Sequence, residues 1–328
     1  MRINDLPRVK LAVLPTPLEP LKNLSKELGG PQIYIKRDDM TGLATGGNKT
    51  RILEFILGDA LNLGADIIVT GANPQSNFLR QTTAATRKLG IDLLLVISDK
   101  KPQEINGNLL LTTIMGAEIR FVGGHEDDLE PKMEEIAQEL RELGHTPFII
   151  HRFGSVPKGA TAYVNAFNEL ESQIKQRGLE INKVLVSSAA GTYGGLCLGS
   201  IAANSDIEVM GIAISERKDN WEQNLTDLIN GTANHLGLNI EFRPDDINVK
   251  IDYIGNGYAI PTEGMIKAIK LVAKTEGVLL DPIYTGKGMA GLIDLIKKEV
   301  FTEDDKVVFW HTGGVPSLFP PQFRQLFT

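Results

Sequence analysis

The 328-residue chain contains a single cysteine, Cys197, and only five histidines. One cysteine cannot form an internal disulfide, and the apolar neighbours Leu196 and Leu198 are typical of a small core residue rather than of a reactive thiol. No two histidines stand at the spacing of metal ligands. We therefore expect neither disulfides, nor thiol catalysis, nor a bound metal.

Excess positive charge and long apolar runs are also missing. The formal net charge is -7 and no basic patch is interleaved with aromatic residues, which argues against a nucleic-acid partner. The longest apolar stretches, such as residues 93–97, are too short to span a membrane. Charged residues interrupt residues 1–20, so no signal peptide is predicted. These absences predict a cytoplasmic protein that binds neither nucleic acid nor membranes.

Short β-rich runs alternate with helical patterns along nearly the whole chain. The strands are apolar at consecutive positions, as expected when helices cover both faces of a parallel sheet. This pattern predicts an α/β fold, with a soft boundary at the glycine- and proline-containing segment 153–159. Strands are predicted at 66–70, 92–97, 118–122, 147–151, 183–187, 207–214 and 306–311. Helices are predicted at 49–63, 77–89, 107–115, 126–143, 160–177, 193–203, 217–236, 262–276 and 287–299.

Lys49 follows a glycine-rich turn and opens one of these helices. Gly46 and Gly47 allow the backbone to take positive φ and to approach a ligand closely. The partial positive charge at a helix start favours a neutral, nucleophilic amine. That form of lysine makes a Schiff base with an aldehyde such as pyridoxal phosphate.

Two other interpretations of this turn stay open. Residues 42–50 read G-x-x-x-x-G-N-K-T, which is a nucleotide P-loop apart from the inserted Asn48. The preceding residues 34–39 do not read as an apolar strand that feeds into such a loop. Lys49 is also consistent with an ordinary surface lysine near a helix start.

Three further loops follow predicted strands, at the edge where parallel α/β sheets bind ligands. Residues 187–192 offer small side chains, a helix N-terminus and the Thr192 hydroxyl, which suit a phosphate group. Residues 71–77 suit a carboxylate, although Ser76 is equally consistent with a simple helix N-cap. Residues 311–314 end the last strand.

Taken in order, these motifs resemble the D-cysteine desulfhydrase and 1-aminocyclopropane-1-carboxylate deaminase family of tryptophan-synthase-β-like, fold-type II pyridoxal phosphate enzymes. The resemblance covers almost the whole chain. It implies two open parallel-sheet α/β domains with the cofactor in the cleft between them, and a homodimer. Residues 1–48 plus 155–328 would form the large domain and residues 49–154 the small one. The motifs are Leu14-Pro15-Thr16-Pro17-Leu18, Lys36-Arg37-Asp38-Asp39, Gly46-Gly47-Asn48-Lys49, Gln75-Ser76-Asn77, Ala190-Gly191-Thr192, Asp281-Pro282-Ile283-Tyr284 and His311-Thr312-Gly313-Gly314.

The resemblance also implies roles for individual residues. Lys49 would carry pyridoxal 5'-phosphate through a Schiff base, Asn77 would contact its 3-hydroxyl, and the amides of residues 190–192 would hold its phosphate. Ser76 would receive the substrate carboxylate, and Tyr258 and Tyr284 match the two active-site tyrosines of the family. The implied cofactor site is Lys49, Asn48, Asn77, Ala190, Gly191, Thr192, Thr285 and Thr312. The implied catalytic residues are Lys49, Ser76, Tyr258 and Tyr284, and the implied site of the substrate carboxylate is Ser76, Asn77 and Phe78.

The expected reaction follows from the residues near the ring nitrogen. Thr285 stands where the deaminases carry an acid, so with Thr312 the nitrogen would meet neutral hydroxyls. The weaker electron sink that results suffices when the β-substituent leaves readily. We expect Lys49 to remove the α-proton and a sulfur group to depart, giving pyruvate, ammonia and sulfide.

Other activities stay open at this point. Residues 39–43 and 46–51 look closest to L-cysteate sulfo-lyases, which release sulfite, and cyclopropane ring opening belongs to the same family. Phe78 stands where family members usually have histidine or glutamine, and Pro74 is atypical, so another small amino acid substrate stays open as well. From other classes, a nucleotide-dependent kinase and a noncatalytic binding protein remain alternatives.

Overall fold

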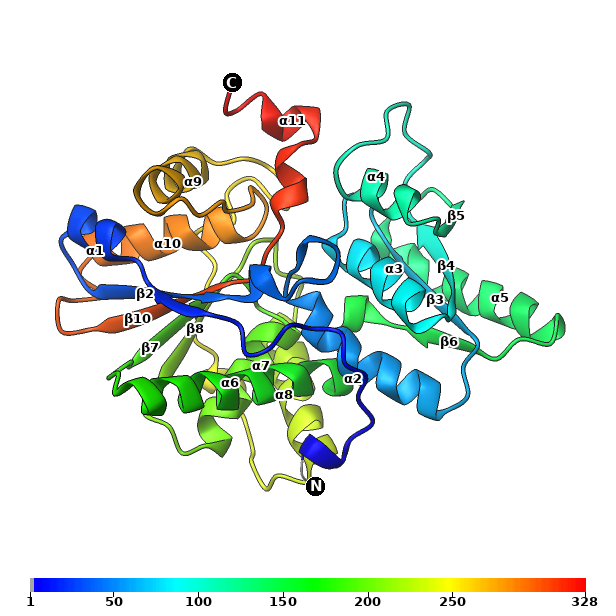
Figure 1. The fold of residues 1–328 in the computed structure, drawn as a ribbon, viewed down its shortest axis with the longest axis horizontal. Coiled ribbons are helices and arrows are strands. Elements are labelled where there is room, and N and C mark those ends of the chain that lie inside the picture. Colours follow the sequence, from blue (N-terminus) through cyan, green and yellow to red (C-terminus); the bar gives the residue numbers. More distant parts are fainter. Residues whose placement is uncertain (1–2) are drawn as a thin grey trace.

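The computed structural model describes residues 3–328, which form two sheets with helices on both faces (Figure 1). The strands are β1 (Leu18–Pro20), β2 (Gln32–Arg37), β3 (Ile67–Ala72), β4 (Asp92–Ile97), β5 (Glu118–Phe121), β6 (Pro147–Ile150), β7 (Lys183–Val186), β8 (Glu208–Ile212), β9 (Val249–Lys250) and β10 (Lys306–His311). The α-helices are α1 (Lys22–Leu28), α2 (Lys49–Asn62), α3 (Asn77–Leu89), α4 (Gly107–Ile114), α5 (Leu129–Glu142), α6 (Pro157–Arg177), α7 (Gly191–Ala202), α8 (Trp221–Leu236), α9 (Glu263–Glu276), α10 (Thr285–Lys297) and α11 (Pro321–Arg324).

The larger sheet has six strands in the order β1-β2-β10-β7-β8-β9, and the smaller has four in the order β5-β4-β3-β6. Every pairing is parallel except that of β1 with β2, which is antiparallel. The predicted α/β class with two parallel sheets is therefore confirmed, with β1 as an antiparallel edge strand.

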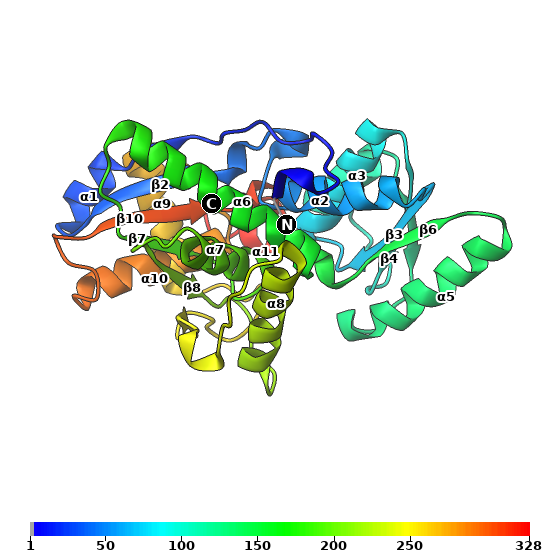
Figure 2. The same ribbon diagram turned by 90° about the horizontal axis from the view of Figure 1, so that it is seen from below.

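Helices bury both faces of the larger sheet. α6, α7 and α8 pack on one face and α1, α9 and α10 on the other, as Figures 1 and 2 show from two directions. In the smaller sheet, α5 packs on β3 and β4 opposite α3. The strands are apolar at consecutive positions because both of their faces are covered.

The strands of the two sheets occupy different parts of the sequence. Strands β3 to β6 fall within residues 49–154, and the strands of the larger sheet fall outside that range. The exact domain boundary stays a prediction, and α2 packs extensively on α6 of the other part. After β10, the chain crosses to α4 of the small part, where Asn108 Nδ2 lies 3.5 Å from Ser317 Oγ.

β2 is missing from the predicted strands, although it is an interior strand between β1 and β10. It ends at Arg37, and a 3-10 turn at Asp38–Met40 separates it from the lysine turn, so it does not lead directly into that turn. Ile33 and Ile35 are buried as expected for a strand, but Lys36 is fully buried as well. Its Nζ donates to Thr16 O at 2.7 Å and to Glu169 Oε1 at 2.6 Å. Because lysine is usually exposed, a buried and paired lysine makes the sequence of an interior strand look like that of a surface loop.

None of the helices in residues 3–328 combines the length and the apolar character needed to cross a membrane.

Candidate active site

Lys49 is the first residue of α2 and follows two glycines in unusual backbone conformations. Gly46 has φ 69° and Gly47 has φ 129°. A Cβ on Gly46 would lie 1.9 Å from Asp39 O, so only glycine fits this turn. The Lys49 side chain is half-buried, and desolvation lowers its pKa to about 8. The amine therefore has a substantial neutral fraction near physiological pH.

Asn48 connects the lysine turn to the two loops predicted to lie beside it. Its backbone N–H donates to Thr312 O at 3.0 Å, and its Nδ2 donates to Thr192 Oγ1 at 3.0 Å. Gly313 packs so closely that a Cβ there would lie 2.8 Å from Gly47 Cα. The structure thus brings together three loops that are far apart in sequence.

The N-terminus of α7 fits a phosphate group. α7 begins at Gly191 without a side-chain cap, and Ala190 before it is extended. The backbone N–H groups of a helix start carry partial positive charge and accept an anionic ligand. The N–H of Ala190 already donates to Ser188 Oγ at 3.3 Å, so the amides from Gly191 onward are the better donors.

Ser76 is the N-cap of α3, as its alternative interpretation held. Its Oγ accepts from the N–H groups of Phe78 at 3.2 Å and Leu79 at 3.3 Å. The hydroxyl proton remains available to a substrate carboxylate. Phe78 is buried, and Lys49 Nζ lies 5.9 Å from the centroid of its ring.

Asn77 has its carbonyl oxygen fixed by two donors. Arg80 Nη1 lies 2.8 Å and Asn108 Nδ2 lies 3.0 Å from Asn77 Oδ1. The Asn77 amino group is thereby directed away from these donors and can donate to a ligand oxygen. Arg80 also donates through Nη2 to Gly46 O at 2.8 Å, and burial lowers its pKa to about 10.

Sequence reasoning missed both Arg80 and Asn108. Arg80 stands three residues after Asn77 on α3, so the two side chains share one helix face. An arginine at a position where the helical pattern predicts burial is a usable signal. Asn108 lies in another helix, and no spacing in the sequence links it to Asn77.

The two tyrosines that the resemblance assigns to the active site contact each other. Tyr258 Oη lies 2.8 Å from Tyr284 Oη, with the rings edge to face. Burial raises the pKa of Tyr284 well above its usual value, and the nearby Tyr258, Asp281 and Glu126 raise it further. Burial also raises the pKa of Tyr258, against hydrogen bonds from Tyr284 and Asn73. Both phenols therefore keep their protons at neutral pH.

Glu126 places a carboxylate beside this pair. Its Oε1 accepts from the backbone N–H of Asn73 at 3.0 Å and from Asn73 Nδ2 at 2.7 Å. Asn73 and Glu126 come from the small part of the chain, whereas both tyrosines come from the large part. The surroundings of the phenols are therefore polar and negative in charge.

Thr285 is fully buried and bonded to Asp281 in both directions. Its hydroxyl donates to Asp281 Oδ1 at 2.6 Å and accepts from the Asp281 N–H at 2.8 Å. Asp281 also accepts from the N–H of Tyr284 at 2.9 Å and touches the 311–314 loop at Gly314. Asp281 therefore organises the tyrosine turn, and the proton of Thr285 is already used. Thr312 is nearly buried, and its carbonyl oxygen accepts from the Asn48 N–H of the lysine turn.

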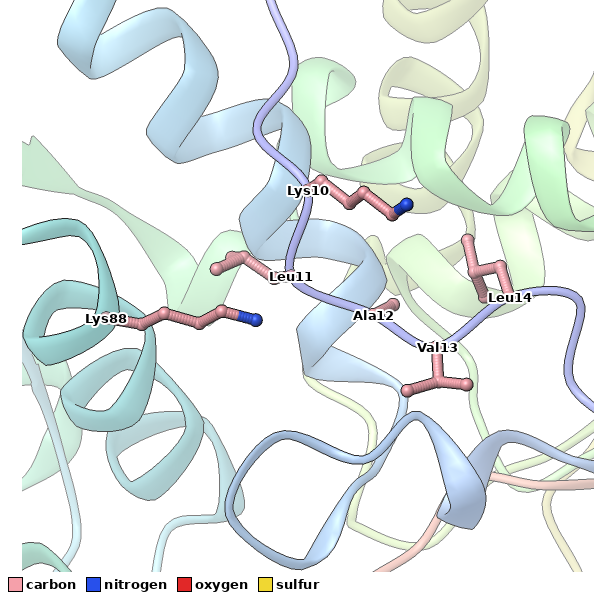
Figure 3. A pocket seen from close by; sticks show the side chains of 6 residues that line it. All are labelled: Lys10, Leu11, Ala12, Val13, Leu14 and Lys88. Atoms are coloured by element: carbon pink, nitrogen blue, oxygen red, sulfur yellow. The ribbon is translucent and has the colours of Figure 1, made fainter.

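The hollow shown in Figure 3 contains none of the predicted site residues. This cavity of about 370 Å³ is lined by Lys10, Leu11, Ala12, Val13, Leu14 and Lys88. A second cavity, of about 640 Å³, is lined by Glu216, Arg217 and residues of the turn before Tyr258. Cys197 is buried, and burial raises its pKa to about 12.

Known proteins similar to this chain agree on one family. Residues 9–313 match the family described as pyridoxal-phosphate dependent enzyme. A D-cysteine desulfhydrase of Salmonella newport is 38% identical over 322 residues, which cover 97% of each chain. A Pyrococcus horikoshii protein provisionally named 1-aminocyclopropane-1-carboxylate deaminase is 40% identical over 314 residues, covering 95% of this chain and 93% of the relative.

Solved structures agree with these relatives. The crystal structure of an ACC deaminase homologue has a TM-score of 0.91 at 38% identity, covering 99% of this chain and 98% of the other. A threonine deaminase of Solanum lycopersicum, 16% identical with a TM-score of 0.68, covers 95% of this chain and 82% of its own and shares the fold. Together the matches point to a pyridoxal-phosphate dependent enzyme and away from a nucleotide-dependent kinase.

Proposed function

Because this chain belongs to the pyridoxal-phosphate dependent enzymes, we propose that it is a lyase that eliminates a thiol group from a small amino acid such as D-cysteine. The products would be pyruvate, ammonia and sulfide. The observation that carries the proposal is the contact between two protonated phenols, Tyr258 and Tyr284. A departing thiolate needs a proton, and this pair can supply it.

The predicted site residues suit the cofactor of the family. When bound, pyridoxal phosphate supplies an electron sink for negative charge at the substrate α-carbon. The uncapped start of α7 would hold its phosphate, and the Asn77 amino group would face its 3-oxygen. Lys49, with a pKa of about 8, would hold it covalently and then act as the base at the α-carbon.

The charge around the tyrosines supports a thiol rather than a sulfonate as leaving group. Glu126 and Asp281 both raise the pKa of Tyr284. A β-sulfonate, as in L-cysteate, would bring a permanent negative charge toward these carboxylates. A thiol is neutral until it departs, and the phenol proton then neutralises it.

A second candidate, opening of 1-aminocyclopropane-1-carboxylate, is favoured by the names of several relatives. Thr285 supports elimination instead, because its proton is donated to Asp281 and no acid stands at this position. The hydroxyl of Thr312 is the other group assigned to the ring nitrogen, and it is also neutral. Without an acid there, the electron sink is weaker than cyclopropane opening requires.

A substrate comparison tests the proposal. The protein loaded with pyridoxal phosphate is mixed separately with D-cysteine, L-cysteine, L-cysteate and the cyclopropane amino acid. We expect 2-oxo acid and sulfide in equal amounts from D-cysteine, little sulfite from L-cysteate and little 2-oxobutyrate from the cyclopropane. Sulfite or 2-oxobutyrate as the main product would replace the proposal with the corresponding alternative, and no product at all would leave a binding protein.

We further propose a homodimer, as the resemblance implies, and a location in the cytoplasm. Light scattering of the purified protein at micromolar concentration tests the first part, with about twice the chain mass of 35.8 kDa as the expected result. Location of a tagged chain in its own cells tests the second.

A further inference from the structure

Lys287 is a buried cation without a carboxylate among its hydrogen-bond partners. It lies in the first turn of α10, and its side chain is fully buried. Its Nζ donates to Ile254 O at 2.6 Å and to Gly257 O at 2.8 Å. A buried ammonium costs stability, and a cation in the first turn also opposes the helix dipole. Such a residue is retained when its position serves another purpose.

The two carbonyl groups belong to the turn that carries Tyr258. Residues 251–262 lie between β9 and α9 without regular secondary structure, and Gly255 and Gly257 have positive φ. The backbone hydrogen bonds within the turn are long, at 3.4 Å for Ile254 N to Ile251 O and 3.4 Å for Ile260 N to Gly257 O. The bonds from Lys287 are much shorter and hence dominate the placement of the turn.

The same end of α10 carries the partner of Tyr258. Tyr284 is the residue before α10, three positions ahead of Lys287. Tyr258 is 38% exposed, so packing alone holds its ring loosely. The start of α10 thus positions both tyrosines. Tyr284 directly precedes the helix, and the Lys287 ammonium binds the backbone next to Tyr258.

We propose that Lys287 is a positioning residue that fixes the Tyr258 hydroxyl against the Tyr284 hydroxyl by clamping the carbonyl groups of Ile254 and Gly257. The inference rests on the elimination proposed above, in which the tyrosine pair protonates the leaving group. Lys287 itself exchanges no proton with the substrate. It sets the geometry in which the phenols do so.

The first test uses leaving groups with different needs for a proton. Lys287→Met keeps the length of the side chain but removes its donors. We expect kcat/KM for D-cysteine to fall by about tenfold to a hundredfold, at or below the lower end of the usual contribution of a general acid, because the phenols are displaced and not removed. For β-chloroalanine, whose chloride leaves without a proton, we expect a change below about threefold. Equal losses with both substrates would overturn the proposal.

A double-mutant cycle links the lysine to the tyrosine. In the Tyr258→Phe background, Lys287→Met should cost little further activity with D-cysteine, because the clamp then has no hydroxyl to place. Fully additive losses would contradict the inference. Lys297→Met, at the exposed end of the same helix, is the matched control and should behave as the wild type.

Hydrogen exchange tests the clamp independently of activity. In cofactor-loaded Lys287→Met we expect faster exchange of the amides of residues 255–259, with α10 and the visible cofactor absorbance unchanged. Lys287→Arg, which keeps donors, should restore part of the protection if the methionine variant folds poorly. Unchanged protection in the methionine variant would refute the clamp. If the wild type gives no 2-oxo acid from any substrate, the elimination fails while this experiment still judges the clamp.

Discussion

Arg51 and Arg80 are both buried, in the neighbouring helices α2 and α3, but only Arg51 is paired with carboxylates. Arg51 Nη2 lies 2.9 Å from Asp38 Oδ1 and 2.8 Å from Glu169 Oε1. Although burial lowers the pKa of Arg51, these two carboxylates outweigh burial and raise it. Arg80 bonds instead to two asparagines and a backbone carbonyl, and its pKa falls to about 10.

The difference separates a structural region from a functional one. The paired region joins β2, α2 and α6, and Lys36, Tyr163 and Trp310 complete its hydrogen bonds. The unpaired cations Lys49, Arg80 and Lys287 all lie at the predicted site, next to the lysine turn or the tyrosine turn. The buried cation Arg51 is thus neutralised by carboxylates in the region that joins β2, α2 and α6. The cations near the predicted ligand site have no such partners.

Arg51→Met breaks the paired region and should have the largest effect on stability. It leaves Asp38 and part of Glu169 buried without their main cation, and this costs about 3–5 kcal/mol. Chemical denaturation of the wild type and variant measures the loss. Arg120→Met removes an exposed pair with Glu139 and should cost less than about 1 kcal/mol. A similar loss in both variants would remove the distinction between buried and exposed pairs.

Arg80→Met should cost less stability but more function. Its partners are neutral, so removing the guanidinium leaves only unsatisfied oxygens, at about 1–3 kcal/mol. Asn77 would no longer be held in one orientation, and the affinity for pyridoxal phosphate should fall by about tenfold. Titration of the cofactor-free protein with pyridoxal phosphate measures this. Destabilisation as large as that of Arg51→Met, with unchanged cofactor affinity, would reverse the comparison.

Lys49 should titrate near pH 8 in the cofactor-free protein. Its folded-state pKa of about 8 lies below the ordinary value of 10.5, so between these values the unfolded chain binds more protons than the folded one. The free energy of unfolding should therefore rise with pH over this window relative to Lys49→Met. The rate of cofactor loading should also rise with pH and level off above about 8. Titration near 10.5 instead would show that the cleft does not desolvate the amine.

Glu126→Gln should have the smallest effect and should change only the selectivity between L-cysteate and D-cysteine. Removing one exposed carboxylate near the tyrosines should raise kcat/KM for L-cysteate relative to D-cysteine by about threefold. Glu134→Gln, an exposed change on α5, is the control. An unaltered ratio would mean that the negative charge at residue 126 does not reach the leaving group.

Local signals predicted the regular elements well. Helix α3 was predicted at residues 77–89 and runs over Asn77–Leu89, because its apolar periodicity and its N-cap agree. The antiparallel β1 and the interior β2 were missed, since three residues carry no pattern and Lys36 disguises a buried strand. A residue's burial depends on partners that only the fold supplies.

Residues of the candidate site that belong to a sequence motif could be predicted. Residues that belong to it only through contacts in the folded chain could not. The structure brings Asn48, beside Lys49, to Thr192 at the α7 start and brings Tyr258 to Tyr284, while the roles of these residues stay predictions. The resemblance assigned Thr285 to the ring nitrogen, a role that stays a prediction now that its proton is seen to reach Asp281. Asn108 and Lys287 bond to partners distant in sequence, which no spacing reveals, whereas Arg80 stands three residues from its partner Asn77.

Hydride trapping tests the central claim most directly. The cofactor-saturated protein is reduced with borohydride, digested and analysed by mass spectrometry for the added mass of the reduced cofactor. We predict that the adduct lies on Lys49 and that Lys49→Ala carries none. An adduct on another lysine, or none in the saturated wild type, would contradict the assignment of the site.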